Sequence, residues 1–174
     1  MKLLTSTFFT LLLIGFAGSS YSQDFDETKL LAEQGDASAQ LLLGNMYRSG
    51  FGVPENNAEA VKWYRLAAEQ GYARAQNKLG AMYSSGDGVP ENDAEAVKWY
   101  QLAADQGNAR AQYSLGLMYD YGNGVPKNDA EAVKWYRLAA EQGNASAQYR
   151  LRFMDDYGFG VPESDSEAVK SGRQ

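Results

Sequence analysis

Few of the side chains that carry enzyme chemistry are present in this chain of 174 residues. Histidine and cysteine are both absent, so the commonest general base, the thiolate nucleophile and the softer metal ligands are missing. No serine begins a Ser-x-x-Lys motif, and the Gly-x-Ser-x-Gly motif of esterases does not occur. Only Asp, Glu and Lys remain for acid–base chemistry, as in glycosidases. The sequence therefore predicts no catalytic residue, no metal site and no bound cofactor.

Carboxylates recur at fixed positions, which favours a structural role for them. An Asn or Ser stands three residues before a Glu at Asn56–Glu59, Asn92–Glu95, Asn128–Glu131 and Ser164–Glu167. This is the spacing of a capping box, in which the first side chain and the Glu each bond a main-chain amide at a helix start. A catalytic pair is needed only once, so four copies indicate capping. Asp155-Asp156 is the one acidic anomaly, and we expect it to lie at a solvated helix end.

A glycine-rich motif, Gly-x-Gly-Val-Pro, also occurs four times, beginning at Gly50, Gly86, Gly122 and Gly158. Glycine-rich loops can cradle phosphate groups, but a phosphate loop follows a strand and continues into Lys-Ser or Lys-Thr. Neither feature accompanies the motif here. Since glycine permits positive φ and proline lies just before the next capping residue, the motif predicts a tight turn between helices.

These motifs belong to a pattern with a period of 36 residues, the distance from Gly50 to Gly86. A fixed period in this range is the signature of a solenoid, in which each unit buries its apolar face against its neighbours. The predicted units are a helix remnant at 23–35, three repeats at 36–71, 72–107 and 108–143, and a truncated fourth repeat at 144–174.

Each repeat contains two runs of apolar residues with helical spacing. In the first repeat, Ala39, Leu43 and Met46 share one face of a helix at about residues 37–48, and a second helix is expected at about residues 57–70. Neither run alternates with the period of a strand. The sequence therefore predicts an all-α protein.

Glycine and aromatic residues indicate how the two helices of a repeat pack. Gly44 and its equivalents lie inside the first helix, where glycine costs about 1 kcal/mol relative to alanine. This repeated cost predicts that the second helix crosses there, with Ala67 and Ala68 opposite the glycine. The Trp-Tyr pairs, Trp63-Tyr64 in the first repeat, are expected to fill the space between units. An aromatic ligand box is the alternative interpretation of the same rings.

The first 22 residues lie outside the repeats and have the anatomy of a secretory signal peptide. Lys2 precedes an apolar run from Leu3 to Ala17, and Ser20-Tyr21-Ser22 places small residues before a cleavage point at Gln23. An uncleaved membrane anchor is the alternative. We therefore expect a periplasmic or secreted protein with no membrane span once residues 1–22 are removed.

Asp and Glu outnumber Lys and Arg, 22 to 16, and Lys2 is the one charged residue of the predicted signal. Nucleic-acid-binding proteins concentrate positive charge, so this balance argues against a nucleic-acid partner. It also disfavours adsorption to anionic lipid.

The repeated residues resemble those of a known family. Ala-Gln-x-x-Leu-Gly-x-Met-Tyr at 39–47, the Gly-x-Gly-Val-Pro turn and Ala-Val-Lys-Trp-Tyr at 60–64 are similar to the Sel-one-like repeat, a relative of the tetratricopeptide repeat. The resemblance covers about residues 27–170. It implies a right-handed α/α superhelix that serves as an adaptor or scaffold for protein complexes, often in exported bacterial proteins. Some cysteine-rich relatives are associated with β-lactam binding or hydrolysis, but their cysteines are absent here.

The copies differ mainly on one side of the first helix. Positions 41, 77, 113 and 149 read Leu, Asn, Tyr and Tyr, and positions 45, 81, 117 and 153 read Asn, Ala, Leu and Phe. Both sets point away from the second helix, toward the side expected to line the concave surface. Because Tyr, Phe and Arg are common interface anchors, we predict a partner-binding surface formed by Arg74, Arg110, Tyr113, Leu117, Tyr149 and Phe153. The alternative is that Tyr113 and Tyr149 merely pack on adjacent first helices.

The predicted function is that of an exported scaffold that binds a protein or peptide and has no catalysis of its own, with the bacterial envelope implied by the resemblance. A cell-wall or β-lactam-acting hydrolase is the alternative from another class, and a toxin-neutralising or enzyme-regulating partner is a third. The fourth repeat departs from the pattern at Arg152 and Asp155 and lacks Trp-Tyr. Its open end is therefore a candidate homodimer contact.

Overall fold

A computed structural model describes residues 24–159, and every regular element in that range is an α-helix. A helical segment at residues 24–33 precedes α2 (Ala37–Ser49), α3 (Asn57–Glu69), α4 (Ala73–Ser85), α5 (Asp93–Asp105), α6 (Ala109–Tyr121), α7 (Asp129–Glu141) and α8 (Ala145–Tyr157). The helices predicted at 37–48 and 57–70 are confirmed to within one residue. The predicted signal peptide and the second helix of the fourth repeat, with its Ser164–Glu167 cap, lie outside the described residues.

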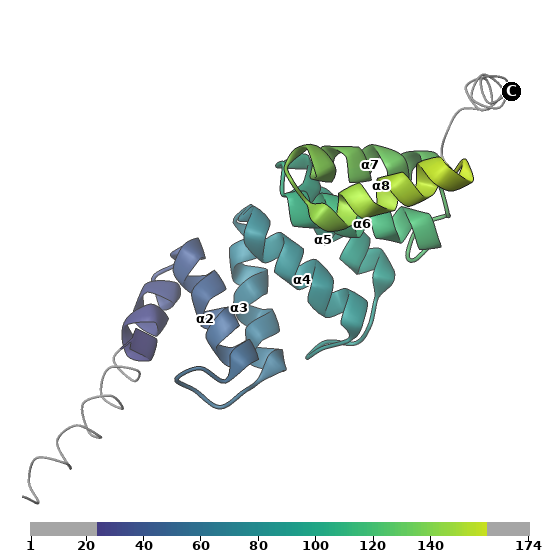
Figure 1. Cartoon of the computed structure of the whole chain (residues 1–174). Helices are drawn as coiled ribbons and strands as arrows, with labels where there is room; N and C mark the ends of the chain where they lie inside the picture. The colour runs from purple at the N-terminus through teal and green to yellow at the C-terminus, as the bar shows by residue number, and fades with distance from the viewer. Residues whose placement is uncertain (1–23, 160–174) are drawn as a thin grey trace, which may run out of the picture.

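Helices that follow one another in the chain lie against one another along the whole array (Figure 1). α2 packs on α3, α3 packs on α4, and the same succession continues to α8. The even-numbered helices are the first helices of the repeats, and the odd-numbered helices are the second. The array bends as it proceeds, so that α8 runs across the direction of α2 (Figure 1). The expected all-α superhelix of helix pairs is confirmed.

The asparagines predicted to cap the second helices do so, but only half of each capping box forms. Asn56 Oδ1 accepts a hydrogen bond from the Glu59 amide at 3.1 Å, and the equivalent asparagines of the next two repeats bond in the same way. The Glu59 carboxylate does not return to the cap but pairs with Lys62. The reason is that the Asn56 amide already donates to the main-chain oxygen of Tyr47 at 2.8 Å. This bond ties the start of α3 to the end of α2.

The glycine-rich turns hold neighbouring repeats in close contact. Gly88, in the turn between α4 and α5, has a φ of 70°, and a Cβ atom there would lie 2.4 Å from the main-chain oxygen of Asn57. Gly124 of the following turn meets Asp93 in the same way. The turn of one repeat therefore packs on the start of the second helix in the repeat before it. This contact gives the motif the structural role predicted for it.

The glycine inside the first helix of each of the first three repeats makes room for a tyrosine ring. A Cβ atom at Gly44 would lie 2.6 Å from two ring carbons of Tyr64 and 3.3 Å from the main-chain oxygen of Ala60. The predicted helix crossing is confirmed, but the prediction that Ala67 and Ala68 lie opposite the glycine is wrong. Ala68 instead faces the next repeat, where its carbonyl oxygen accepts a bond from Gln76.

The tryptophans fill the space between units, as expected. Trp63 packs against an apolar cluster that contains Ala32 of the preceding segment and Leu43 of its own repeat. Trp135 is 7% exposed and belongs to the same apolar cluster as Tyr100, which lies in the repeat before it. These contacts favour core packing over a ligand box.

A row of buried glutamines, which the sequence analysis did not predict, links three successive helices in each unit. The Gln76 side-chain amide donates to the Ala68 carbonyl oxygen on α3 at 3.1 Å. Its own carbonyl oxygen accepts a bond from Gln106, at the end of α5, at 2.7 Å. Gln40 and Gln112 repeat the arrangement. Since a buried amide must find partners, these bonds fix how each first helix sits between its neighbours.

Candidate partner-binding surface

The six residues predicted to bind a partner lie on three successive first helices, and five of them form two groups that line different depressions. Tyr113, Tyr149 and Phe153 line one depression of about 580 Å³ between α6 and α8, together with Ala145, Ser146 and Arg150. Arg74 and Arg110 line another, described below, on α4 and α6. Leu117 lines neither of these two depressions.

Exposed aromatic rings form the first group, which we call the aromatic depression. The side chain of Tyr149 is 69% exposed and that of Phe153 is 40% exposed. Large apolar side chains exposed together on one face are typical of interaction sites. Among the described helices, α7 is the one that packs extensively on α8.

Tyr113 and Leu117 are half-buried and contribute to the core as well. The Tyr113 ring centroid lies 5.7 Å from that of Tyr136 on α7. Leu117 packs against the apolar cluster that contains Tyr136 and Met154. The packing alternative thus applies to Tyr113, although its partner is the second helix of its own repeat. It does not apply to the exposed Tyr149.

The charge of Arg150 at the edge of the aromatic depression is compensated. Its guanidinium lies 3.7 Å from the Asp120 carboxylate and 5.3 Å from the centroid of the Tyr121 ring, and it donates to the Tyr121 hydroxyl. The Tyr136 hydroxyl donates to the same carboxylate at 3.0 Å. Burial, followed by the negative charge of Asp120, raises the pKa of Tyr136. The depression therefore offers apolar surface without a free charge.

The second group forms a surface of opposite character. Arg74 and Arg110 line a depression of about 610 Å³ with Lys78 and with the amides of Asn45 and Asn77. Arg110 and Lys78 also line an adjoining depression of about 310 Å³, which includes Arg48 and Tyr113. The sequence analysis missed Arg48 and Lys78, although Lys78 stands where other first helices carry Leu42 or Ser114.

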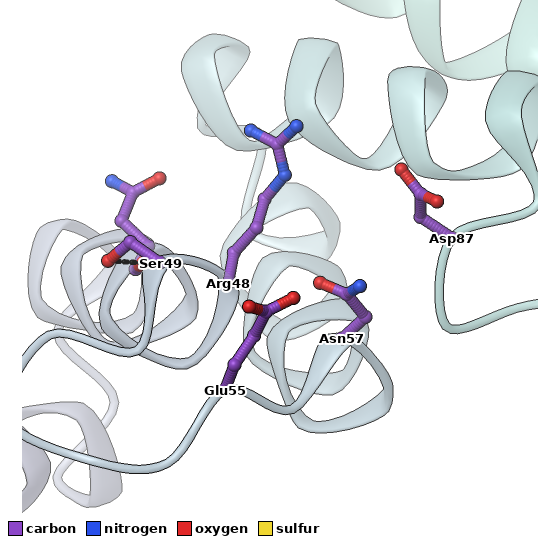
Figure 2. Close-up of a pocket in the computed structure, with 6 residues that line it drawn as sticks. Arg48, Ser49, Glu55, Asn57 and Asp87 are labelled. Carbon is purple, nitrogen blue, oxygen red and sulfur yellow. Dashed lines mark hydrogen bonds between the residues drawn. The ribbon is translucent and has the colours of Figure 1, made fainter.

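A mixed polar depression borders this surface at the end of α2. Figure 2 shows Arg48 beside Glu55 and Asn57, with Asp87 on the neighbouring turn. The Ser49 hydroxyl donates to the main-chain oxygen of Asn45 at 2.9 Å. No ion pair joins Arg48 to the carboxylates in this part of the structure.

Across residues 24–159, no group of three or more Asp or Glu side chains is placed to hold a metal ion. None of the helices in the same range is long and apolar enough to cross a membrane. Asp155 and Asp156 lie exposed in the last turn of α8, at a solvated helix end.

Four consecutive segments, 37–72, 73–108, 109–144 and 145–170, match the profile of the Sel1 repeat. The chain belongs to the Sel1 repeat family. Sel1 repeat proteins are scaffolds for protein–protein interaction. A comparison with curated protein sequences found no match.

Two solved structures of Sel1 repeat proteins share the fold and much of the sequence. One is c5321, a protective antigen present in uropathogenic Escherichia coli strains, with 42% identity and a TM-score of 0.80 over 86% of this chain. The other is a Sel1 repeat protein from Oxalobacter formigenes, with 40% identity and a TM-score of 0.78 over 86% of this chain. The chain spans 32% of the first relative and 62% of the second.

Cysteine rich protein B of Helicobacter pylori has the same fold at lower identity. It is 21% identical, with a TM-score of 0.62, and the match covers 75% of this chain and 96% of that one. This likeness shows the fold alone.

Proposed function

We propose that this Sel1 repeat protein is an exported scaffold that binds another protein through the aromatic depression and has no catalysis of its own. The observation that carries the proposal is the pair of exposed rings of Tyr149 and Phe153 beside Tyr113. Full burial of one such ring on binding contributes about 2 kcal/mol. Three rings on two adjacent helices therefore suffice for an anchor at the centre of an interface.

Export is proposed from the signal-peptide pattern of residues 1–22. A periplasmic or secreted scaffold in a bacterial envelope fits this pattern. The E. coli relative is a protective antigen, and an antigen that confers protection must be accessible to the host. This supports, for the present chain, a role outside the cytoplasm.

The absence of catalysis is proposed from the residues available. The chain has no histidine or cysteine, and the repeated glutamates, such as Glu59 and Glu95, pair with lysines at helix starts. The alternative of a cell-wall or β-lactam-acting hydrolase is tested by incubating the purified protein with nitrocefin and with muropeptides. Turnover of either substrate above a no-protein blank contradicts this part of the proposal.

Partner binding is tested by crosslinking capture from the envelope fraction, with the captured protein then purified for titration. We expect Tyr149→Ala to weaken binding by about 1–3 kcal/mol, since an exposed aromatic anchor loses its contact area. Tyr113→Ala should weaken binding by a similar amount and also lower the melting temperature, because its ring packs on Tyr136. Leu41→Ala, on α2, should matter less.

The matched control is Leu102→Ala, which removes an exposed apolar side chain, 48% exposed, from α5. Thermal melts of all variants separate lost binding from lost folding. If Tyr149→Ala and Tyr113→Ala keep full affinity while the melting temperature falls, the rings are structural and the site lies elsewhere.

A further inference from the structure

Four positive side chains gather on the first helices of the first three repeats, and we call the surface they line the basic groove. They are Arg48 on α2, Arg74 and Lys78 on α4, and Arg110 on α6. The two depressions that form the groove share Asn77, Lys78 and Arg110, so they adjoin. No Asp or Glu lines either depression, although acidic residues outnumber basic ones in the chain by 22 to 16.

Several cations of residues 24–159 have a carboxylate partner, but the four of the basic groove, like Arg65, Arg137 and Arg152, do not. Lysines on the second helices pair with glutamates one turn away, as Lys62 does with Glu59, and Arg150 pairs with Asp120. Between residues 24 and 159, no ion pair involves a side chain of the basic groove. Partial burial, followed by the positive charges of Arg48 and Arg110, lowers the pKa of Lys78. Arg48 lies beside Glu55 in the bordering depression, whereas no carboxylate lines the groove around Arg74, Lys78 and Arg110, which therefore hold uncompensated positive charge.

Unpaired like charges in a depression repel one another and focus a positive potential on whatever enters it. A ligand with several separated negative charges relieves this repulsion. The groove also presents Asn77, which lines both of its depressions. A side-chain amide can bond both the N–H and the C=O of a polypeptide. Carboxylates on a peptide backbone match both features.

We propose that the basic groove binds an extended acidic segment of a partner protein, with Asp or Glu side chains placed against Arg48, Arg74, Lys78 and Arg110. This inference rests on the proposed scaffold function, for which it names the chemistry of the partner. Successive first helices lie no closer than the about 8–10 Å of helices in direct contact, so a groove over three of them is at least about 16–20 Å long. At about 3.3 Å per residue, it accommodates about six extended residues.

A nucleic acid is the competing source of negative charge, and the structure favours the peptide. A longer polyanion would extend past the groove onto a protein whose net charge is −6. Single-stranded nucleic acids also bind through aromatic stacking along the strand, whereas Tyr113 is the one ring that lines the groove. A short acidic segment needs neither a long basic track nor a row of rings.

The test titrates the purified protein into a fluorescein-labelled hexaglutamate peptide and follows fluorescence anisotropy at low ionic strength. We expect saturable binding that weakens as salt is added, because screening acts on exposed charges. Lys78→Gln and Arg110→Gln should each raise the Kd by about fivefold. The matched controls are Lys98→Gln and Lys134→Gln, which remove the same charge from lysines paired on the second helices. They should change the Kd by less than about twofold.

Three results would overturn the inference. They are no saturable binding of hexaglutamate, equal losses in the groove and control variants, or tighter binding of a labelled hexathymidylate than of the peptide. Circular dichroism melts test whether the groove variants fold. We expect Arg110→Gln to fold normally, because Arg110 is exposed. Tyr149→Ala distinguishes the two proposals. If it abolishes capture of the partner while hexaglutamate never binds, the scaffold function stands and the acidic segment does not.

Discussion

The glycine inside the first helix of the first three repeats provides a test of the packing. The effect of replacing it on the free energy of unfolding should change sign when the tyrosine that it contacts is removed. In Gly80→Ala, the added Cβ would lie 2.8 Å and 2.9 Å from two ring carbons of Tyr100 and 3.2 Å from the main-chain oxygen of Ala96. The ring is almost fully buried and the oxygen belongs to α5, so the two helices must separate slightly. Such overpacking costs about 1–3 kcal/mol.

The same substitution also brings a gain, because alanine is a better helix former than glycine by about 1 kcal/mol. The net effect expected for Gly80→Ala is therefore a loss of about 1–2 kcal/mol in the free energy of unfolding. For a chain of this length, that loss lowers the melting temperature by about 2–8 °C. Urea unfolding followed by circular dichroism measures the midpoint and slope from which the free energy is obtained.

Removing the ring should reverse the sign. In a Tyr100→Leu background the aromatic carbons are gone, so Gly80→Ala should be neutral or should stabilise by up to about 1 kcal/mol. Gly116 and Tyr136 form the same contact one repeat later and provide an independent copy of the experiment. If Gly80→Ala is equally destabilising in both backgrounds, the ring is not the reason for the glycine. If it stabilises the wild-type protein, the close contact itself is refuted.

Three further predictions concern the core, the pH range and the compartment. Gln76→Leu leaves the Ala68 carbonyl oxygen and the Gln106 amide without their partner, which should cost about 1–3 kcal/mol in urea titration; an unchanged midpoint contradicts this. Burial raises the pKa of Tyr64 to about 12 from its ordinary value of 10.0. The neutral ring therefore contributes stability below pH 10 that is lost as the pH rises to about 12, and Tyr64→Phe should lose less stability over that range. Equal losses in both proteins contradict the assignment. Protein recovered from the envelope fraction should begin at or near Gln23, and an intact Met1 on cytoplasmic protein would rule out export.

The helices and their caps could be predicted from the sequence because each depends on residues close together in the chain. Apolar spacing within one helix fixes which face is buried. The Asn56 cap requires only the amide three residues later. The other half of the capping box could not be foreseen, since it was replaced by a bond to Tyr47 in the helix before. That competing partner is visible only once the two helices are placed side by side.

Contacts between helices were harder to predict than the helices themselves, because several residues of each helix could make the same contact. Ala67 and Ala68 are small, as a helix crossing would require, yet the glycine of the same repeat meets Tyr64. Small residues alone do not indicate which neighbour they face. The buried glutamines did leave a signal. Gln40 and Gln70 recur with the same period as the apolar core, and a polar residue at a core position requires a partner.

For the candidate surface, the sequence identified the variable side of the first helices but not its division into two parts. Tyr149 and Phe153 stand exposed at the last described helix, as expected of a patch. Arg74 and Arg110 were placed at the border of that patch. The structure groups both with Lys78, and Arg110 also lines a depression with Tyr113 of the patch. This grouping depends on which side chains of successive helices face the same depression, and a single helical wheel does not contain that information.

The uniform contacts between repeats have a consequence for how the gene can change. Residues 58–71 and 130–143 are identical, and both lead into a first helix through the same glutamine and glycine contacts. Unequal crossing-over within these segments would remove two whole repeats in frame and join α3 to α8 through residues of the same types. The shortened protein would lose Arg74, Lys78 and Arg110 of the basic groove and Tyr113 of the aromatic depression, but retain Tyr149 and Phe153. Recombination could thus delete one recognition surface and alter the other in a single step, so the specificity of the scaffold can evolve by changes in repeat number.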